Sequence, residues 1–408
     1  MAFKKEREAM KPKELITTKE FGMFYHLFCD VFEKNDTPDL RKIFFELHVH
    51  GTVLGFVQDE QLLSGLAWWR FKVVFQGCRY NMGAVGSVMT APAARKKGNS
   101  TLLLQRALEQ MAASGMTLSY LDPFSHAFYR RLGYGAAINH MHYTIAPEQI
   151  QLPRLADGLQ EAAVSSSVQT GLLSEYLDKV ASFYTQQLIH KSGGLLRPKW
   201  WWQHLCAERI EICCCLNTKQ QLEGYFLYKR TRKSLILKEL LVKNAGAEKS
   251  LLQFLHIQWR NIEQVIFESD EPVYRGQLLN EPLALSVQVK PFMMARIIDL
   301  QDFILRYPFK NINFGDFVLA VSDSQLAQNN GVWRLCTKNG RISFFKCALA
   351  PQEADINTSI AELVPLFFGQ YSLEWAALHQ RIVVKSLFKS VKLQAALLTA
   401  PVSFNDDF

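Results

Sequence analysis

The alternation of apolar and polar positions is clearest in residues 85–136, where it changes from strand-like to helical. Apolar Val85, Val88 and Met89 precede Pro92, which lacks the backbone N–H that a continuing strand needs. Apolar side chains then recur at the spacing of one helix face, at Leu104, Ala107, Leu108 and Met111. The pattern therefore predicts a strand, a turn and an amphipathic helix.

The predicted turn is basic and contains a glycine. Its residues are Arg95, Lys96, Lys97, Gly98, Asn99, Ser100 and Thr101. We expect Asn99 or Ser100 to be the N-cap of the helix, which puts Gly98 beside N–H groups that have no partner within the helix. Such a helix start attracts anions, and a glycine lets a phosphate come close to the backbone. The turn predicts a phosphate site, although basic turns before helices also occur without one.

A second strand and a short helix follow the amphipathic helix. Residues 117–121 form a short apolar run that ends before Pro123, and Ser125 is a suitable cap for a helix that carries Tyr129. Gly133 stands where a left-handed residue commonly ends a helix. A phenol at this place could protonate a leaving group or could simply belong to the core.

The spacing Arg95-x-x-Gly98-x-Ser100 after a strand resembles the acyl-CoA pyrophosphate loop of the GNAT acetyltransferases. Tyr129 matches the tyrosine that faces the CoA sulfur in that family. Together with residues 125–134, the chain resembles the Eis-like (enhanced intracellular survival) acetyltransferases over nearly its whole length. The resemblance implies an α+β fold with two GNAT-like mixed-sheet domains in tandem and a C-terminal sterol-carrier-protein-like α/β domain.

The domain boundaries that we expect follow this order. Residues 1–147 would be the catalytic GNAT domain, 155–290 a degenerate GNAT-like domain and 291–408 the sterol-carrier-like domain, with its tail in the active site. The polar segment 147–158 has two prolines and is interpreted as a linker. In the second domain, the loop 244–250 has a single lysine and no Arg-x-x-Gly-x-Gly, so we expect neither CoA nor catalysis there.

The remaining periodicity predicts these elements in detail. In the first domain we expect a helix at 17–32 and strands at 45–50, 53–58, 61–69 and 138–145. In the second we expect helices at 172–187 and 251–262 and strands at 210–216, 221–229, 234–242 and 264–267. In the third we expect helices at 299–307, 359–367 and 373–379, and strands at 316–322 and 332–337 joined by a tight turn at Asn329-Asn330-Gly331.

Composition narrows the list of partners. The chain has 408 residues, enough for two or three domains, and a net charge of +8 that suits an anionic ligand such as CoA. Its basic residues are dispersed and form no nucleic-acid motif, so we expect no nucleic-acid partner. No run of about 18 uncharged apolar residues occurs, so we expect no membrane span. The N-terminus has no apolar signal core, so a cytoplasmic location is expected.

Two groups of metal-ligand residue types occur in strand-like runs. Cys213, Cys214 and Cys215 are consecutive, so their sulfurs would point to alternate faces and could not converge on one ion. His140 and His142 share a face, but no third ligand is apparent. We therefore expect no metal.

The last residue, Phe408, carries a second prediction that depends on the resemblance. In Eis-like enzymes the chain ends inside the active site, and the terminal carboxylate acts as general base. We expect Asp406 and Asp407 to raise the pKa of this carboxylate and to attract a cationic amine. Asp122 and His126 are alternative bases, and a disordered tail is the ordinary alternative.

These observations predict an N-acetyltransferase that moves an acetyl group from acetyl-CoA to a primary amine by direct attack. Tyr129 would be the acid and Phe408 the base. Val88, Met89 and Thr90 would lie beside the pantetheine, the residues from Arg95 to Thr101 would hold the pyrophosphate, and Phe124 and Ser125 would flank the thioester. Acidic Asp30 and Glu33 favour an aminoglycoside, polyamine or lysine acceptor.

Two other functions remain open from the sequence. One is a non-catalytic protein that binds CoA or lipid, and the other is an acetyltransferase for protein lysines. A homo-oligomer is also expected, because the family contains such assemblies.

Overall fold

The computed structural model describes residues 11–150, 167–189, 191–259, 262–271, 276, 279, 281–312, 315–338, 340–398 and 402–408. The chain divides into two compact units. Unit 1 comprises Met1–Ala137, Met293–Ala400 and Asp407–Phe408, and unit 2 comprises Ile138–Phe292 and Pro401–Asp406. The predicted linker 147–158 is described only as far as Ile150, and the three predicted domain boundaries stay predictions.

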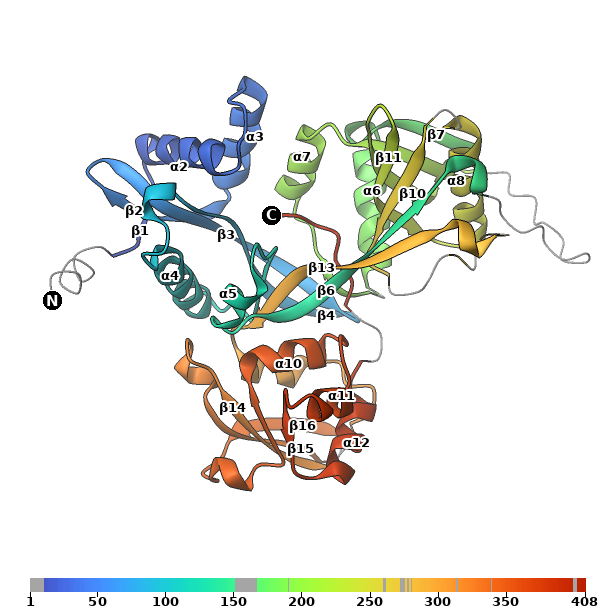
Figure 1. The fold of residues 1–408 in the computed structure, drawn as a ribbon. Coiled ribbons are helices and arrows are strands. Elements are labelled where there is room, and N and C mark those ends of the chain that lie inside the picture. The colour runs from blue at the N-terminus through green and yellow to red at the C-terminus, as the bar shows by residue number, and fades with distance from the viewer. Residues whose placement is uncertain are drawn as a thin grey trace, which may run out of the picture. The chain divides into compact units, whose positions relative to one another are not determined.

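The first part of unit 1 is a mixed sheet in the order β1-β2-β3-β4-β5, with the end of β13 beside β5. β4 and β5 are parallel, and the other neighbours are antiparallel. Figure 1 shows α2 and α3 over one face of this sheet and α4 and α5 over the other. The bounds are β1 Lys13–Glu14, α2 Thr18–Val31, α3 Pro38–His48, β2 Gly51–Gln58, β3 Gln61–Phe75, β4 Cys78–Thr90, α4 Asn99–Ala113, β5 Leu118–Leu121 and α5 His126–Arg130.

The predicted strand at 45–50 is wrong, because most of this segment belongs to helix α3. The Thr37 hydroxyl accepts a hydrogen bond from the Leu40 amide, and Pro38 occupies the first turn, where its missing N–H costs nothing. Phe44 and His48 stand four residues apart on one helix face and are both buried. The helix starts at Pro38, seven residues before the predicted strand, so the signals that decide it lie outside that segment.

Strand β4 is irregular where it passes the end of β5. Met82 to Val85 pair with Leu118 to Leu121, and no pairing with β5 continues beyond Val85. On the other side, Gly65 pairs with Met89 and Ala67 with Gly86, so two residues of β4 stand opposite one residue of β3. This is a β-bulge, and β4 and β5 diverge from it.

The rest of unit 1 is a five-stranded sheet in the order β16-β15-β14-β17-β18 with four helices. β14 and β15 pair antiparallel as predicted, but residues 323–330 connect them and include a 3-10 turn at Ala327–Asn329, so the tight Asn-Gly turn was wrong. The bounds are α9 Leu300–Arg306, β14 Asp316–Ser322, β15 Gly331–Lys338, β16 Arg341–Lys346, β17 Ile356–Ser359, α10 Ile360–Phe367, α11 Leu373–Leu378, β18 Val383–Val384 and α12 Leu387–Ala396.

Two ion pairs, one of them fully buried, link the two sheets of unit 1. Arg296, at the end of β13, is fully buried and makes a bidentate pair with Asp323, at 2.7 and 2.8 Å. Arg130 of α5 pairs with Glu362 of α10. Removing either partner of the fully buried Arg296–Asp323 pair would leave an uncompensated buried charge.

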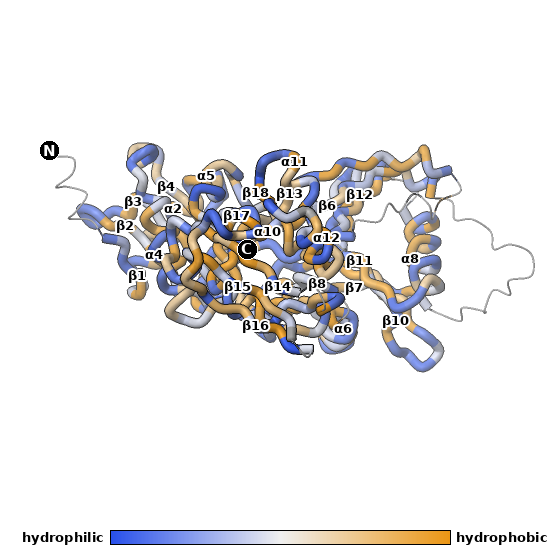
Figure 2. The backbone as a smooth tube through the Cα atoms, turned by 90° about the horizontal axis from the view of Figure 1, so that it is seen from below, coloured by the Kyte–Doolittle hydropathy of each residue, from blue (hydrophilic) through white to orange (hydrophobic). Residues whose placement is uncertain are grey.

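The strands of unit 2 include a series that pairs in the order β6-β12-β11-β10-β9-β7. Residues 213–215 alternate along β9 and are all buried, as the strand pattern indicated. Helix α8 places Ala247, Leu251 and Leu255 in the core, and hydropathy alternates around its turns (Figure 2). The bounds are β6 Gly135–Ile145, β7 Ser167–Leu172, α6 Leu173–Leu188, β8 Ser192–Leu195, α7 Lys199–Ala207, β9 Glu211–Leu216, β10 Leu222–Arg230, β11 Ser234–Val242, α8 Ala245–Gln258, β12 Gln264–Ser269 and β13 Ser286–Ile297.

Among the helices that are described, none combines the length and the apolar character needed to cross a bilayer.

Candidate active site

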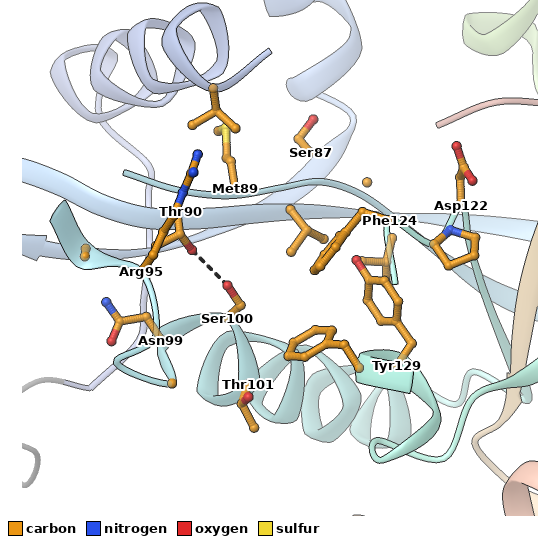
Figure 3. A pocket seen from close by; sticks show the side chains of 18 of the residues that line it. Ser87, Met89, Thr90, Arg95, Asn99, Ser100, Thr101, Asp122, Phe124 and Tyr129 are labelled. Atoms are coloured by element: carbon orange, nitrogen blue, oxygen red, sulfur yellow. Dashed lines mark hydrogen bonds between the residues drawn. The ribbon is translucent and has the colours of Figure 1, made fainter. Parts of the chain in front are cut away.

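A cavity of about 830 Å³ opens in unit 1 where β4 and β5 diverge. Arg95 and Asn99 lie at one end of it, and Asp122 and Tyr129 lie at the other (Figure 3). The site residues predicted from the sequence that line it are Val88, Met89, Thr90, Arg95, Lys96, Gly98, Asn99, Ser100, Thr101, Phe124, Tyr129 and Phe408. Lys97 and Ser125 are not among its lining residues.

Helix α4 starts at the Arg95 end of the cavity without a side-chain cap. Its N-cap is Gly98, at φ 85°, and in the part of the chain that the structure describes no side-chain cap bond is made there, so the prediction of Asn99 or Ser100 as the cap was wrong. The Ser100 hydroxyl instead bonds to that of Thr90 at 2.8 Å, which ties the helix start to the end of β4 (Figure 3). Uncapped amides at a helix N-terminus are available to an anion.

The side chain of Asn99 is a second feature of this helix start that suits an anion. Its Nδ2 is buried and has no hydrogen-bond partner among the described residues. Such a donor normally has a partner, because an unpaired buried polar group costs about 1–3 kcal/mol. Arg95 and Lys96 line the same end of the cavity, so the residues present suit a phosphate group.

Tyr129 is held by contacts on both sides of its short helix. Before it, Ser125 caps α5 by accepting from the Phe128 amide at 3.4 Å, as predicted. After it, Arg296 donates to the Leu132 carbonyl and packs so closely on Gly133 that a Cβ there would overlap the guanidinium. Gly133 has φ 86°, which confirms its predicted left-handed conformation.

The Tyr129 side chain is almost fully buried beside the cavity, with 1% exposed. Burial raises the pKa of its phenol, and the nearby Tyr134 and Asp122 raise it further. A raised pKa keeps the Tyr129 phenol protonated at neutral pH, so it has a proton to donate toward the cavity. The ring of Phe124 stands edge-on to it at 5.1 Å.

The carboxyl end of the chain reaches the same cavity. The Phe408 ring lies 5.4 Å from that of Phe71. Its carboxyl group lies so close to Gly86 that a Cβ built there would be 2.8 Å from a carboxyl oxygen and 2.9 Å from the carboxyl carbon. Gly86 was missed by the sequence reasoning, although a glycine inside a strand is a known sign of close backbone approach.

Asp406 does not have the role that we expected of it. Within unit 2, its Oδ1 accepts hydrogen bonds from Arg197 Nε at 2.8 Å and Trp201 Nε1 at 2.7 Å, and only 3% of the residue is exposed. Burial raises the pKa of this carboxyl group, against the opposing effect of Arg197. A buried, paired carboxylate cannot attract an amine from solution, so the prediction for Asp406 was wrong.

The alternative bases differ in position. Asp122 lines the cavity and His126 is not among the lining residues. Of the acidic residues expected near the acceptor, Asp30 and Glu33 are absent from the lining, whereas Val31 and Phe32 between them belong to it.

Comparison with known families assigns three segments of the chain. Residues 14–137 and residues 193–297 each match an acetyltransferase (GNAT) domain, and residues 300–403 match a sterol carrier protein domain. The chain is a tandem-GNAT acetyltransferase with a sterol carrier protein domain. This confirms the predicted α+β architecture.

Solved structures repeat this organisation over full length. A probable N-acyltransferase from Enterococcus faecalis is 25% identical, with a TM-score of 0.87 over 98% of this chain and 100% of that chain. A GCN5-related N-acetyltransferase from Anabaena variabilis is 20% identical, with a TM-score of 0.83 over 98% and 100%. Eis1 from Mycobacterium abscessus is 18% identical, with a TM-score of 0.77 over the same shares, so the predicted resemblance to Eis-like proteins is confirmed for the fold. A search of curated proteins found no match.

Proposed function

We propose that this tandem-GNAT protein transfers an acetyl group from acetyl-CoA to a primary amine in the cavity of unit 1. The observation that carries the proposal is the meeting of three features in one cavity: the uncapped start of α4, the buried phenol of Tyr129 and the terminal carboxyl group against Gly86. Each suits a different step of direct acyl transfer.

The binding of the donor is supported by the chemistry of the cavity's basic end. Arg95, Lys96, the Asn99 amide and the free N–H groups of α4 would hold the pyrophosphate. From there the divergent part of β4, at Val88 to Thr90, extends toward Tyr129, so its main chain would accompany the pantetheine.

The transfer itself needs one group that accepts a proton and one that donates a proton. The Phe408 carboxylate would take the proton from the attacking amine, and a backbone N–H near the bulge would stabilise the oxyanion. As the C–S bond breaks, Tyr129 would donate its proton to the sulfur. Asp122 is the alternative base, since it also lines the cavity.

The proposal is tested by measuring thiol release from acetyl-CoA with purified protein and a panel of aminoglycosides, polyamines and lysine peptides. Adding one glycine after Phe408 keeps the ring but moves the carboxylate, and we expect kcat to fall about 100-fold with CoA binding retained. Tyr129→Phe should lower kcat by about 100-fold as well. Tyr134→Phe is the matched control, because this buried phenol bonds to Ser119 and is not among the lining residues.

Three outcomes would count against parts of this assignment. Binding of CoA without turnover of any amine would favour the non-catalytic binding protein, and turnover of lysine peptides alone would favour a protein acetyltransferase. Full activity of the extended chain would transfer the role of base to Asp122.

A further inference from the structure

Ser87 occupies a backbone conformation that its residue type disfavours. It lies on the bulge of β4 and lines the cavity, with φ 49°. A side chain with a Cβ is uncommon at positive φ, and such residues persist only where the surroundings hold them in place. The neighbours of Ser87 in the chain are Gly86, which contacts the Phe408 carboxyl group, and Val88, which lines the cavity.

The contact that holds Ser87 comes from the last turn of α3. His48 Nε2 lies 3.1 Å from the Ser87 hydroxyl, and His48 Nδ1 lies 2.7 Å from the Phe44 carbonyl oxygen. Because a carbonyl only accepts, Nδ1 carries a proton, so Nε2 of the neutral ring accepts the hydrogen bond from Ser87.

The position of the His48 ring is itself strongly determined. Only 1% of the residue is exposed, and the ring stacks on Phe44 at 3.9 Å and lies 5.3 Å from the ring of Trp69. Trp69 Nε1 donates to the Leu47 carbonyl at 3.0 Å, which fixes the end of α3 against β3. His48 is thus a rigid acceptor aimed at a strained residue of the cavity wall.

We propose that His48 and Ser87 are a positioning pair that keeps the bulge of β4 in its catalytic shape. The hydrogen bond holds Ser87 at positive φ and thereby sets the direction of the backbone from Gly86 to Val88. That short segment faces the terminal carboxyl group at Gly86 and borders the site of the thioester, so one hydrogen bond adjusts the base and the oxyanion-binding backbone together. This inference rests on the proposed function for its effect on kcat, whereas the hydrogen bond itself can be tested without it.

Ser87→Gly distinguishes a hydroxyl that only positions the backbone from one that takes part in the reaction, because glycine adopts positive φ without strain. We expect Ser87→Ala, which keeps the strain and loses the hydroxyl, to lower kcat about 10-fold with little change in KM for acetyl-CoA. Ser87→Gly should keep kcat within about threefold of the parent protein. His48→Phe, which preserves ring stacking, should match Ser87→Ala, and in the Ser87→Gly background it should have little further effect.

A reacting hydroxyl would give a different result. If Ser87 relayed a proton or became acylated, Ser87→Gly would lose as much activity as Ser87→Ala, and the positioning role would be overturned. Intact mass after incubation with acetyl-CoA alone would show whether an acyl-serine forms.

Melting temperatures of the same four proteins give a readout that needs no turnover. Ser87→Ala and His48→Phe should each lower the melting temperature, and Ser87→Gly should make the His48 substitution less damaging. Additive shifts would contradict the pair even in an active enzyme. Coupled shifts in a protein that acetylates no amine would support the pair while the proposed function fails.

Discussion

The two GNAT domains of this chain share a parallel strand pair with a helix between the strands, yet the helices begin in opposite ways. In unit 1, α4 starts at Gly98 with no side-chain cap, and Asn99 Nδ2 has no partner among the described residues. In unit 2, α8 starts at Asn244, whose side-chain oxygen accepts from the Ala247 amide at 2.8 Å. One helix start is open to an anion, and the other is closed by its own side chain.

The cavity beside α4 also differs from a pocket beside α8 in volume and in polarity. The cavity at α4 measures about 830 Å³ and contains basic and polar groups. One pocket beside α8 measures about 70 Å³ and is lined mainly by apolar side chains such as Leu252, Leu255 and Phe267. Two domains of the same topology therefore need not have the same binding site. The residues at the helix start and the side chains between the strands determine whether a site is present.

The largest effect is expected from Gly86→Ala, which tests the close approach of the Phe408 carboxyl group to strand β4. The added Cβ would overlap the Phe408 carboxyl group, because the fit there is below 3 Å, so the carboxylate must move. We expect kcat to fall about 100-fold in the acetyl-transfer assay. Gly83→Ala on the same strand is the control, since its Cβ would meet the flexible Met111 side chain. An active Gly86→Ala protein would contradict the role of the terminal carboxylate.

Asn99→Ala tests the open helix start directly. Loss of a buried donor to a phosphate should weaken CoA binding about 10-fold, as measured by calorimetry. The unpaired Nδ2 has no bond to lose within the described part of the free protein, so the melting temperature without CoA should not fall. An unchanged CoA affinity would remove Asn99 from the phosphate site.

Asn244→Ala is the corresponding test at the capped N-terminus of α8. It removes the cap of α8 and should lower the free energy of unfolding by about 1 kcal/mol, measured by denaturant unfolding followed by circular dichroism. CoA affinity should stay at the parent value. A change in CoA affinity would mean that the second domain also binds the nucleotide.

The N-terminus of helix α2 is capped by a titratable side chain, that of Glu20. The Glu20 carboxylate accepts a hydrogen bond from the Thr17 amide at 2.9 Å and forms an ion pair with Lys13. The hydrogen bond from Lys13, together with those from the backbone, lowers the pKa of Glu20 to about 2. A lowered carboxylate pKa stabilises the fold above the unfolded value near 4.5, and that contribution is lost as the pH falls toward 2.

Glu20→Gln should therefore cost about 0.5 kcal/mol at neutral pH, a small value because solvent screens the pair. The difference between the two proteins should shrink as the pH falls from 4.5 toward 2, which melting curves across this range would show. A difference that is independent of pH would mean that the charge of Glu20 does not contribute.

The features that could be predicted from the sequence are local ones. The basic turn from Arg95 to Ser100, the cap at Ser125 and the left-handed Gly133 each depend on residues a few positions apart, where backbone preferences act directly. Even here the cap of α4 was misplaced by one or two residues, because the helix starts directly after Gly98, at φ 85°, and has no side-chain cap. The strand predicted at 45–50 failed for a related reason: its helix is set by Thr37 and Pro38, outside the apolar run.

By itself, the sequence determined most of the order of strands and helices, the basic, glycine-containing composition of one turn and the place of a phenol after it. Only the tertiary structure decided that the Phe408 carboxyl group lies against Gly86 and that His48 bonds to Ser87. It also decided that Asp406 accepts hydrogen bonds from Arg197 and Trp201. These contacts join residues far apart in the chain, and no local preference encodes them. They arise when the sheets and their covering helices pack, which fixes which side chains share a cavity and which are buried in pairs.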